Sequence, residues 1–230
     1  MEIIKPEDCF EKVHQLWEFV EKNPEIYKEA LKAGEKIRKG NTSDIEKLVK
    51  FLVAWNPRRG YRNLREQLTE NLIAIMSEFE KDHDEEKFIE KLQDILGEAV
   101  KKGRKRPKKT REIIGAIKLA HVLYPEAFPL IDNPIARGIG AKKSETLKVD
   151  EYIHFKDALD ETIRKFKLDF PEREKYKRID ELLYLWYTWK EDNGKSIKKL
   201  FSDLGWEGCI ELFEDFIETL QEEIKKSQQT

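Results

Sequence analysis

The chain has 230 residues, enough for one sizeable domain or two lobes, and its 44 basic residues nearly balance its 46 acidic residues. The 32 Lys and 32 Glu far outnumber the 7 Asn and 6 Gln, a composition typical of proteins from hot environments, and 39% hydrophobic residues exclude global disorder. With no run of about 20 apolar residues, an acidic start and only two cysteines, the sequence argues against a membrane, secreted or cysteine-cluster protein and favours a cytoplasmic one.

Apolar residues recur at intervals of three and four along most of the chain, the spacing of amphipathic helices, as in Phe10, Val13, Trp17 and Val20. Further helices are expected over about 24–39, 45–55, 64–79, 88–100, 113–124, from Asp132, and over 151–166, 174–192, 195–203 and 207–226. Period-2 runs long enough to found a sheet are lacking. We therefore predict an all-α fold of about nine to eleven helices, forming one domain over 1–230 or two lobes over about 1–100 and 111–230.

Two segments concentrate positive charge. The first carries Arg58, Arg59, Arg62 and Arg65 without an acid between Trp55 and Arg65, and the second, 101–111, has eight basic residues and no apolar one. Since the whole chain is at −2, the remainder sums to −14, which is marked charge segregation. Flexible cations near Gly and Pro suit phosphate contacts, and Tyr61 could stack on a base. The residues predicted to bind DNA in the second segment are Lys101, Lys102, Arg104, Lys105, Arg106, Lys108 and Arg111. The competing interpretations are a solvated connection in a Lys-rich protein and a segment that binds an acidic protein or RNA.

Asp132 lies at the expected start of a short helix, after an apolar helix and a Pro-rich turn. An Asp at this position can cap the free N–H groups of the helix, whose dipole holds it ionised, and Pro134 fits the first turn. Lys118, within the apolar helix, either faces the interior or extends along the outer face with its amine in water. His121, one turn later, is most simply a packed core histidine.

The segment Phe128-Pro129-Leu130-Ile131-Asp132, followed by Arg137, resembles the part of helix-hairpin-helix DNA glycosylases that carries the catalytic aspartate. The preceding helix, introduced by Lys109-Thr110, is similar to the one that follows the hairpin in that family, although no L-P-G-x-G hairpin precedes it here. The stretch 177–186 is similar to a late helix of archaeal 8-oxoguanine glycosylases. A further set of uncharacterised helical proteins shares W-x-x-x-R, K-x-x-H-x-x-x-P and P-x-x-D.

The resemblance implies a helix-hairpin-helix glycosylase-like architecture with a degenerate or missing hairpin, and excision of a damaged or mismatched base from DNA. Asp132 would stabilise the positive charge that develops on the sugar, and Lys109 or Lys118 would form a Schiff base if the enzyme is also a lyase. Arg137 would contact DNA. The resemblance implies no cofactor, and the dispersed histidines suggest no metal site.

Two alternatives remain beside the enzyme: a non-catalytic nucleic-acid-binding module, and a helical interaction protein without a nucleic-acid role. If the protein is the enzyme, we expect the Asp132 carboxylate in a cleft, a lysine amine within about 6 Å of it, and both basic segments on the rim of the cleft. The binding module keeps the basic rim alone. The interaction protein has Asp132 engaged in capping bonds and the basic segments on different faces.

Overall fold

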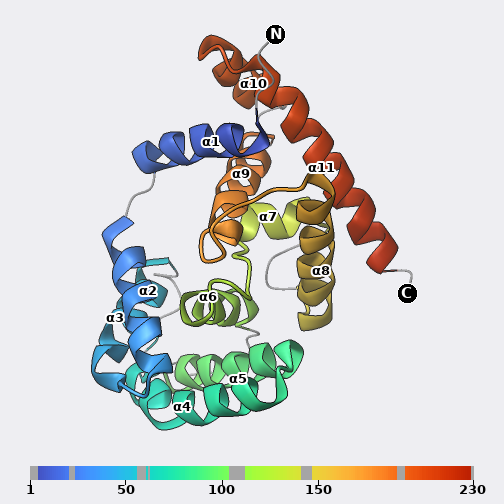
Figure 1. Ribbon diagram of the computed structural model, residues 1–230. Coiled ribbons are helices and arrows are strands. Elements are labelled where there is room, and N and C mark those ends of the chain that lie inside the picture. Colours follow the sequence, from blue (N-terminus) through green and yellow to red (C-terminus); the bar gives the residue numbers. More distant parts are fainter. Residues whose placement is uncertain are drawn as a thin grey trace. The chain divides into compact units, whose positions relative to one another are not determined.

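A computed structural model describes residues 5–20, 24–55, 61, 63–103, 112–140, 147–190 and 195–228. These residues form eleven α-helices and a short 3-10 helix and contain no strand, so the predicted all-α class and helix number are confirmed (Figure 1). None of the described helices combines the length and the apolar composition needed to cross a bilayer.

The helices fall into two compact units that interleave along the chain. Unit 1 comprises residues 1–21, 131–144 and 151–230, and unit 2 comprises 22–130 and 145–150. The basic segment 101–111, considered from the sequence as the joint between two lobes, lies within the bounds of unit 2.

The described residues of unit 2 form five α-helices. They are α2 (Pro24–Arg38), α3 (Ile45–Trp55), α4 (Leu64–Asp82), α5 (Glu85–Gly103) and α6 (Ile113–Leu123), with a 3-10 turn (Thr42–Asp44) between α2 and α3. The most apolar helix, α6, is central and is buried at every position from Gly115 to Leu123. Helix α2 approaches it so closely that a Cβ on Gly34 would lie 2.0 Å from the Val122 carbonyl oxygen. Only glycine fits such a contact without a backbone shift.

Unit 1 contains α1 (Pro6–Val20), α7 (Asn133–Gly138), most of α8 (Val149–Phe166), α9 (Lys175–Lys190), α10 (Lys195–Asp203) and α11 (Glu207–Ser227). Its core holds edge-to-face aromatic contacts of Phe10 with Phe213 and Phe216. Helix α7 packs on α9, where Gly138 leaves room for the Tyr187 ring.

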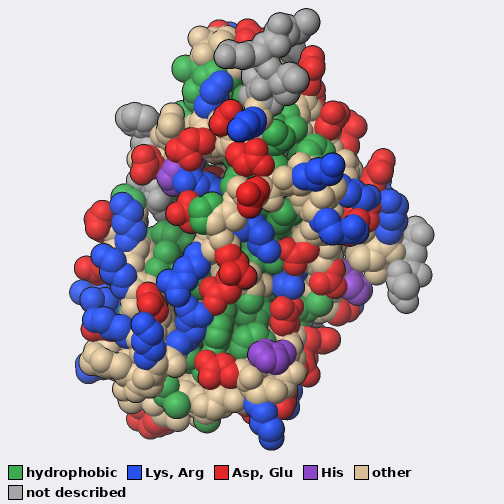
Figure 2. Space-filling model, viewed as in Figure 1, with side chains coloured by type: hydrophobic (Ala, Val, Ile, Leu, Met, Phe, Trp, Pro, Cys, Tyr) green, Lys and Arg blue, Asp and Glu red, His purple; other side chains and the backbone are tan. Residues whose placement is uncertain are grey.

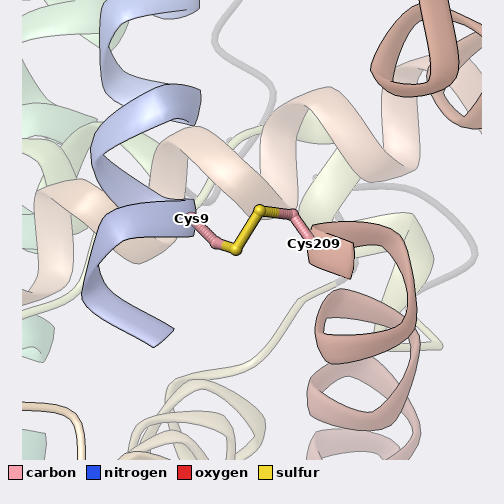
Figure 3. Close-up of a disulfide and its surroundings, with 2 residues drawn as sticks. All are labelled: Cys9 and Cys209. Carbon is pink, nitrogen blue, oxygen red and sulfur yellow. A yellow bond between two sulfur atoms is a disulfide. The ribbon is translucent and has the colours of Figure 1, made fainter. Parts of the chain in front are cut away.

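A disulfide joins Cys9 of α1 to Cys209 of α11 across 200 residues of sequence, with 5.5 Å between the two Cα atoms (Figure 3). Both cysteines are buried. The sequence had excluded a multi-cysteine framework, and a lone pair so far apart carries no spacing signature that would have predicted this bond. The disulfide fixes one end of the N-terminal helix to the C-terminal helix within unit 1.

Candidate nucleic-acid interface

Helices α4 and α5 form an antiparallel hairpin with opposite charges at its two ends. Both have 19 residues and are joined by His83 and Asp84, His83 adopting the left-handed conformation that ends α4. Phe79 stacks on Phe88 beside this turn, with 4.4 Å between ring centroids. Because the helices are equal in length and about 28 Å long, the start of α4 and the end of α5 lie together at the far end.

The turn end of the hairpin is acidic. Residues 78–91 contain seven acids and three lysines. Hydrogen bonds from Lys87 and Lys91 hold the pKa of Glu78 at about 2, and Lys87 in turn has a raised pKa. We call residues 78–91 the acidic tip of unit 2.

The opposite end of the hairpin is where both basic segments join the described fold. Arg65 is exposed in the first turn of α4, and the backbone of Lys101 and Lys102 lies in the last turn of α5. Arg65 pairs with Glu46, with 3.7 Å between Nε and the carboxylate. We call this the basic end of unit 2: residues 56–65 and 101–111.

A hydrogen bond joins the points at which the two basic segments re-enter the fold. The Tyr61 hydroxyl donates to Oε2 of Glu112, the residue before α6, at 3.2 Å. The same hydroxyl lies against Gly115. Arg62 directly follows Tyr61 in the sequence and Arg111 directly precedes Glu112. Segments separated by some 50 residues of sequence therefore return to the fold at one place.

Lys118 is buried, with 2% of its surface exposed, and its amine lies 4.8 Å from the centroid of the Trp55 ring. Lys118 therefore faces the interior, and the alternative in which its amine lies in water is not observed. Such a cation–π contact offsets part of the desolvation of the ammonium. Trp55 is the last residue of α3, next to the arginine segment, so α6 contacts the chain just before that segment, at Trp55, and within it, at Tyr61.

The remaining predicted DNA-binding residues are placed as follows. Arg137 is exposed on α7 of unit 1, with its Nε 3.4 Å from the Asn133 carbonyl oxygen. Outside the described residues lie Arg58, Arg59, Arg62, Arg104, Lys105, Arg106, Lys108, Arg111 and also Lys109, a predicted catalytic lysine.

Asp132 occupies the N-cap of α7, as its position in the sequence predicted, but its side chain makes no capping hydrogen bond. It is half-buried in unit 1, near Tyr184 of α9. Burial and, next, the negative charge of Asp132 raise the pKa of the Tyr184 phenol. The Tyr184 ring packs edge-on against Trp17, with 5.1 Å between centroids. The carboxylate is therefore engaged in something other than helix capping.

A buried ionic cluster between α1 and α9 was not foreseen. The Glu181 carboxylate is fully buried, accepts a hydrogen bond from His14 Nδ1 at 2.9 Å and lies 3.5 Å from the Lys177 amine. Lys177 also lies 3.8 Å from Asp180 and 4.8 Å from the Trp17 ring centroid. The i, i+3 and i+4 spacing of these three charges on α9 was a signal in the sequence, whereas His14 is 167 residues away from Glu181.

His121 is a packed core histidine, as the sequence predicted. Its Nδ1 lies 2.7 Å from the Phe128 carbonyl oxygen and its Nε2 lies 2.7 Å from the Tyr27 hydroxyl. Because a carbonyl only accepts, Nδ1 carries the proton, and neutral Nε2 accepts from Tyr27. The residue thereby ties α6 to α2 and to the turn before Asp132. In the described part of the chain, no group of three or more His, Cys, Asp or Glu could hold a metal ion.

No protein-family model matches the chain, and comparison with curated proteins and with solved structures gives no match either. The functional argument therefore depends on the geometry and charge of this chain.

Proposed function

We propose that this protein binds duplex DNA through the basic end of unit 2. The observation that carries the proposal is the hydrogen bond between Tyr61 and Glu112, which joins the points where the two basic segments re-enter the fold. Twelve basic residues and no acid occupy 56–65 and 101–111. Cations at this density neutralise backbone phosphates and release counterions, which favours binding to DNA without requiring base contacts.

The charge distribution within unit 2 supports a defined orientation on DNA. The acids of the acidic tip lie toward the other end of the α4–α5 hairpin, about 16 Å or more along the helices from Arg65 and from the backbone of Lys101. That separation exceeds the Debye length of about 10 Å at 0.1 M salt, so the acids do not cancel the field at the basic end. The resulting dipole steers the basic end toward a polyanion and turns the acidic tip away.

The test is fluorescence anisotropy of a labelled 24-base-pair duplex at salt concentrations from 50 to 200 mM. We expect affinity to fall by about 10³-fold or more over this range, as for six or more phosphate contacts. The variant Arg62→Gln/Arg65→Gln should reduce the slope of log affinity against log salt by about two. The matched control, Lys81→Gln/Lys225→Gln, removes the same charge from the acidic tip and from α11 and should change nothing. Salt-independent binding, or equal effects in both variants, would refute the proposal.

A second candidate function, base excision, is favoured by Asp132. This residue occupies a helix N-cap without a side-chain capping hydrogen bond and lies half-buried beside Tyr184, whose phenol responds to its negative charge. In this proposal its carboxylate stabilises the cationic sugar that forms as the bond to a damaged or mismatched base breaks. For lyase activity, the amine of Lys118 or Lys109 condenses with the C1′ aldehyde of the abasic sugar and expels water.

Excision is tested with duplexes carrying single damaged or mismatched bases and with an abasic duplex. Asp132→Asn should abolish base release and retain DNA binding, while Asp157→Asn, an exposed change on α8, should retain both. Borohydride should trap a covalent complex that one of Lys118→Gln and Lys109→Gln removes. DNA binding without base release from any substrate would leave the chain a binding module.

A further inference from the structure

A row of lysines follows the exposed face of α2. Lys28, Lys32 and Lys36 are spaced four residues apart, and Lys39 follows just after the helix ends at Arg38. At 100° per residue these four positions lie within about 80° of one another around the helix axis. All four are exposed, while the opposite face of α2 is buried against α3 and α6.

The lysine row continues onto the neighbouring helix. Lys50 is exposed on α3, and Lys47 shares the carboxylate of Asp44 with Lys36 at N–O distances of 3.5 and 2.7 Å. The space-filling view shows Lys and Arg side chains gathered over α2 (Figure 2). We call Lys28, Lys32, Lys36, Lys39 and Lys50 the α2 stripe.

The stripe starts near Trp55, the last described residue before the arginine segment. Tyr27 packs against Phe51, with 6.1 Å between ring centroids, and Phe51 packs against Trp55 at 5.5 Å. Trp55 is the residue from which the arginine segment departs. Lys28 follows Tyr27 directly, so the stripe begins within two ring contacts of that segment and runs away from it along α2.

Acids near the stripe do not block it. Lys28 pairs with Glu25 at 3.6 Å and Lys39 with Glu35 at 3.0 Å, both exposed pairs along the helix. Such exposed pairs add little to stability, so a phosphate can replace the carboxylate. Within the described residues, Lys32 and Lys50 have no carboxylate within 4.0 Å.

We infer that the α2 stripe is a second row of phosphate contacts, which extends the DNA interface from the basic end along one strand of the duplex. The inference rests on the proposed function. From Lys28 to Lys39 the stripe covers about 16 Å, which corresponds to about five phosphates at 3.4 Å of axis per phosphate. A rigid helix holds the cations in a row, so the partner it fits is a rigid duplex rather than a short single strand.

The experiment measures the salt dependence of binding to the 24-base-pair duplex for Lys28→Gln/Lys32→Gln and for Lys32→Glu/Lys50→Glu. Each lysine that contacts a phosphate contributes about 0.9 to the slope, so the first variant should lower it by about two and weaken binding at 100 mM salt at least ten-fold. The second variant, which reverses charge, should weaken binding further. Circular dichroism melts should match the native chain, because all the changed side chains are exposed.

The control is Lys81→Gln/Lys225→Gln, with the same number of exposed helical lysines changed. If the native chain binds DNA and both stripe variants behave as this control does, the stripe is not part of the interface and the proposed function stands. If the stripe variants weaken binding to a 24-nucleotide single strand as much as to the duplex, the assignment to a duplex is wrong. If the native chain binds no DNA even at 50 mM salt, both proposals fail together.

Discussion

The two units bury polar groups by different chemistry. Unit 1 fully buries the Glu181 carboxylate and places the His14 imidazole and the Lys177 amine beside it. Unit 2 buries His121 equally deeply but satisfies it with a hydroxyl and a carbonyl group. Unit 1 also carries the disulfide. An ionic cluster and a disulfide thus stabilise unit 1, whereas around α6 of unit 2 the buried His121 has uncharged partners and the buried Lys118 packs on the Trp55 ring.

This difference means that the solution conditions should act on one unit more than on the other. A buried ion pair responds to pH and to the loss of either partner, and a disulfide responds to reductant. The contacts of His121 in unit 2, with a hydroxyl and a carbonyl group, include neither an ion pair nor a disulfide. Changes of pH, removal of an ion-pair partner and reduction should therefore change the stability of unit 1 more than that of unit 2.

Opening the disulfide is expected to have the largest effect. Chain-entropy estimates for a closed loop of about 200 residues give about 5 kcal/mol, an upper value. The variant Cys9→Ala/Cys209→Ala should lose hydrogen-exchange protection in α1 and α11 and keep it in α4 and α5. Equal loss in all four helices would show that the units unfold together and would remove the contrast between them.

Replacing Glu181 with Leu should come next. The substitution leaves the cations of His14 and Lys177 without their central carboxylate, and breaking a buried pair in this way costs about 3 to 5 kcal/mol. Urea unfolding monitored by tryptophan fluorescence measures the loss, and Glu211→Leu, at an exposed position on α11, serves as the control. A difference below about 1 kcal/mol between the two variants would contradict the role of the cluster.

In unit 2 the corresponding change is His121→Leu, for which we expect a loss of about 2 to 4 kcal/mol. It removes the acceptor for the Tyr27 hydroxyl and the donor to the Phe128 carbonyl. Adding Tyr27→Phe should recover part of the loss, because the hydroxyl then no longer needs an acceptor. The unfolding free energies of the single and double variants give the coupling, and strictly additive losses would show that the two side chains are independent.

The smallest expected effect is the change in the free energy of unfolding with pH. A hydrogen bond to Glu181, opposed by partial burial, raises the pKa of His14 above 6.5, and Glu18 adds to the rise while Arg178 opposes it. A raised pKa stabilises the fold fully below about pH 6.5, and this contribution is lost as pH rises through the folded-state value. Because His14 is partly exposed, we expect less than about 1 kcal/mol. The urea midpoint should fall between pH 6 and pH 8, and less so in His14→Gln.

Local signals predicted the elements of this fold. Each helix has an apolar stripe at helical spacing, so the expected ranges lie within a few residues of the observed ones, apart from earlier starts at Pro6 and Glu85. The division into interleaved units could not be predicted, because it depends on which apolar faces meet. The disulfide and the contact between His14 and Glu181 span 200 and 167 residues, and nothing local marks them.

The candidate interface was predicted in part. Charge segregation located both basic segments, and Asp132 was correctly placed at a helix start. The meeting of the segments depends on one hydrogen bond between residues 51 positions apart. Lys118 faces inward and packs on the Trp55 ring, and this contact between two helices has no local signal in the sequence. The spacing of four residues between the lysines of α2 is present in the sequence. It suggests a phosphate-binding row only once the structure places the start of α2 near Trp55.

The bond between Cys9 and Cys209 gives the chain a covalent topology that differs from its linear sequence. Residues 9 to 209 form a ring, and both stretches of unit 2 lie within that ring. A single proteolytic cut anywhere between the cysteines therefore linearises the ring without releasing a fragment. Nicked protein should migrate as two pieces on a denaturing gel only after reduction.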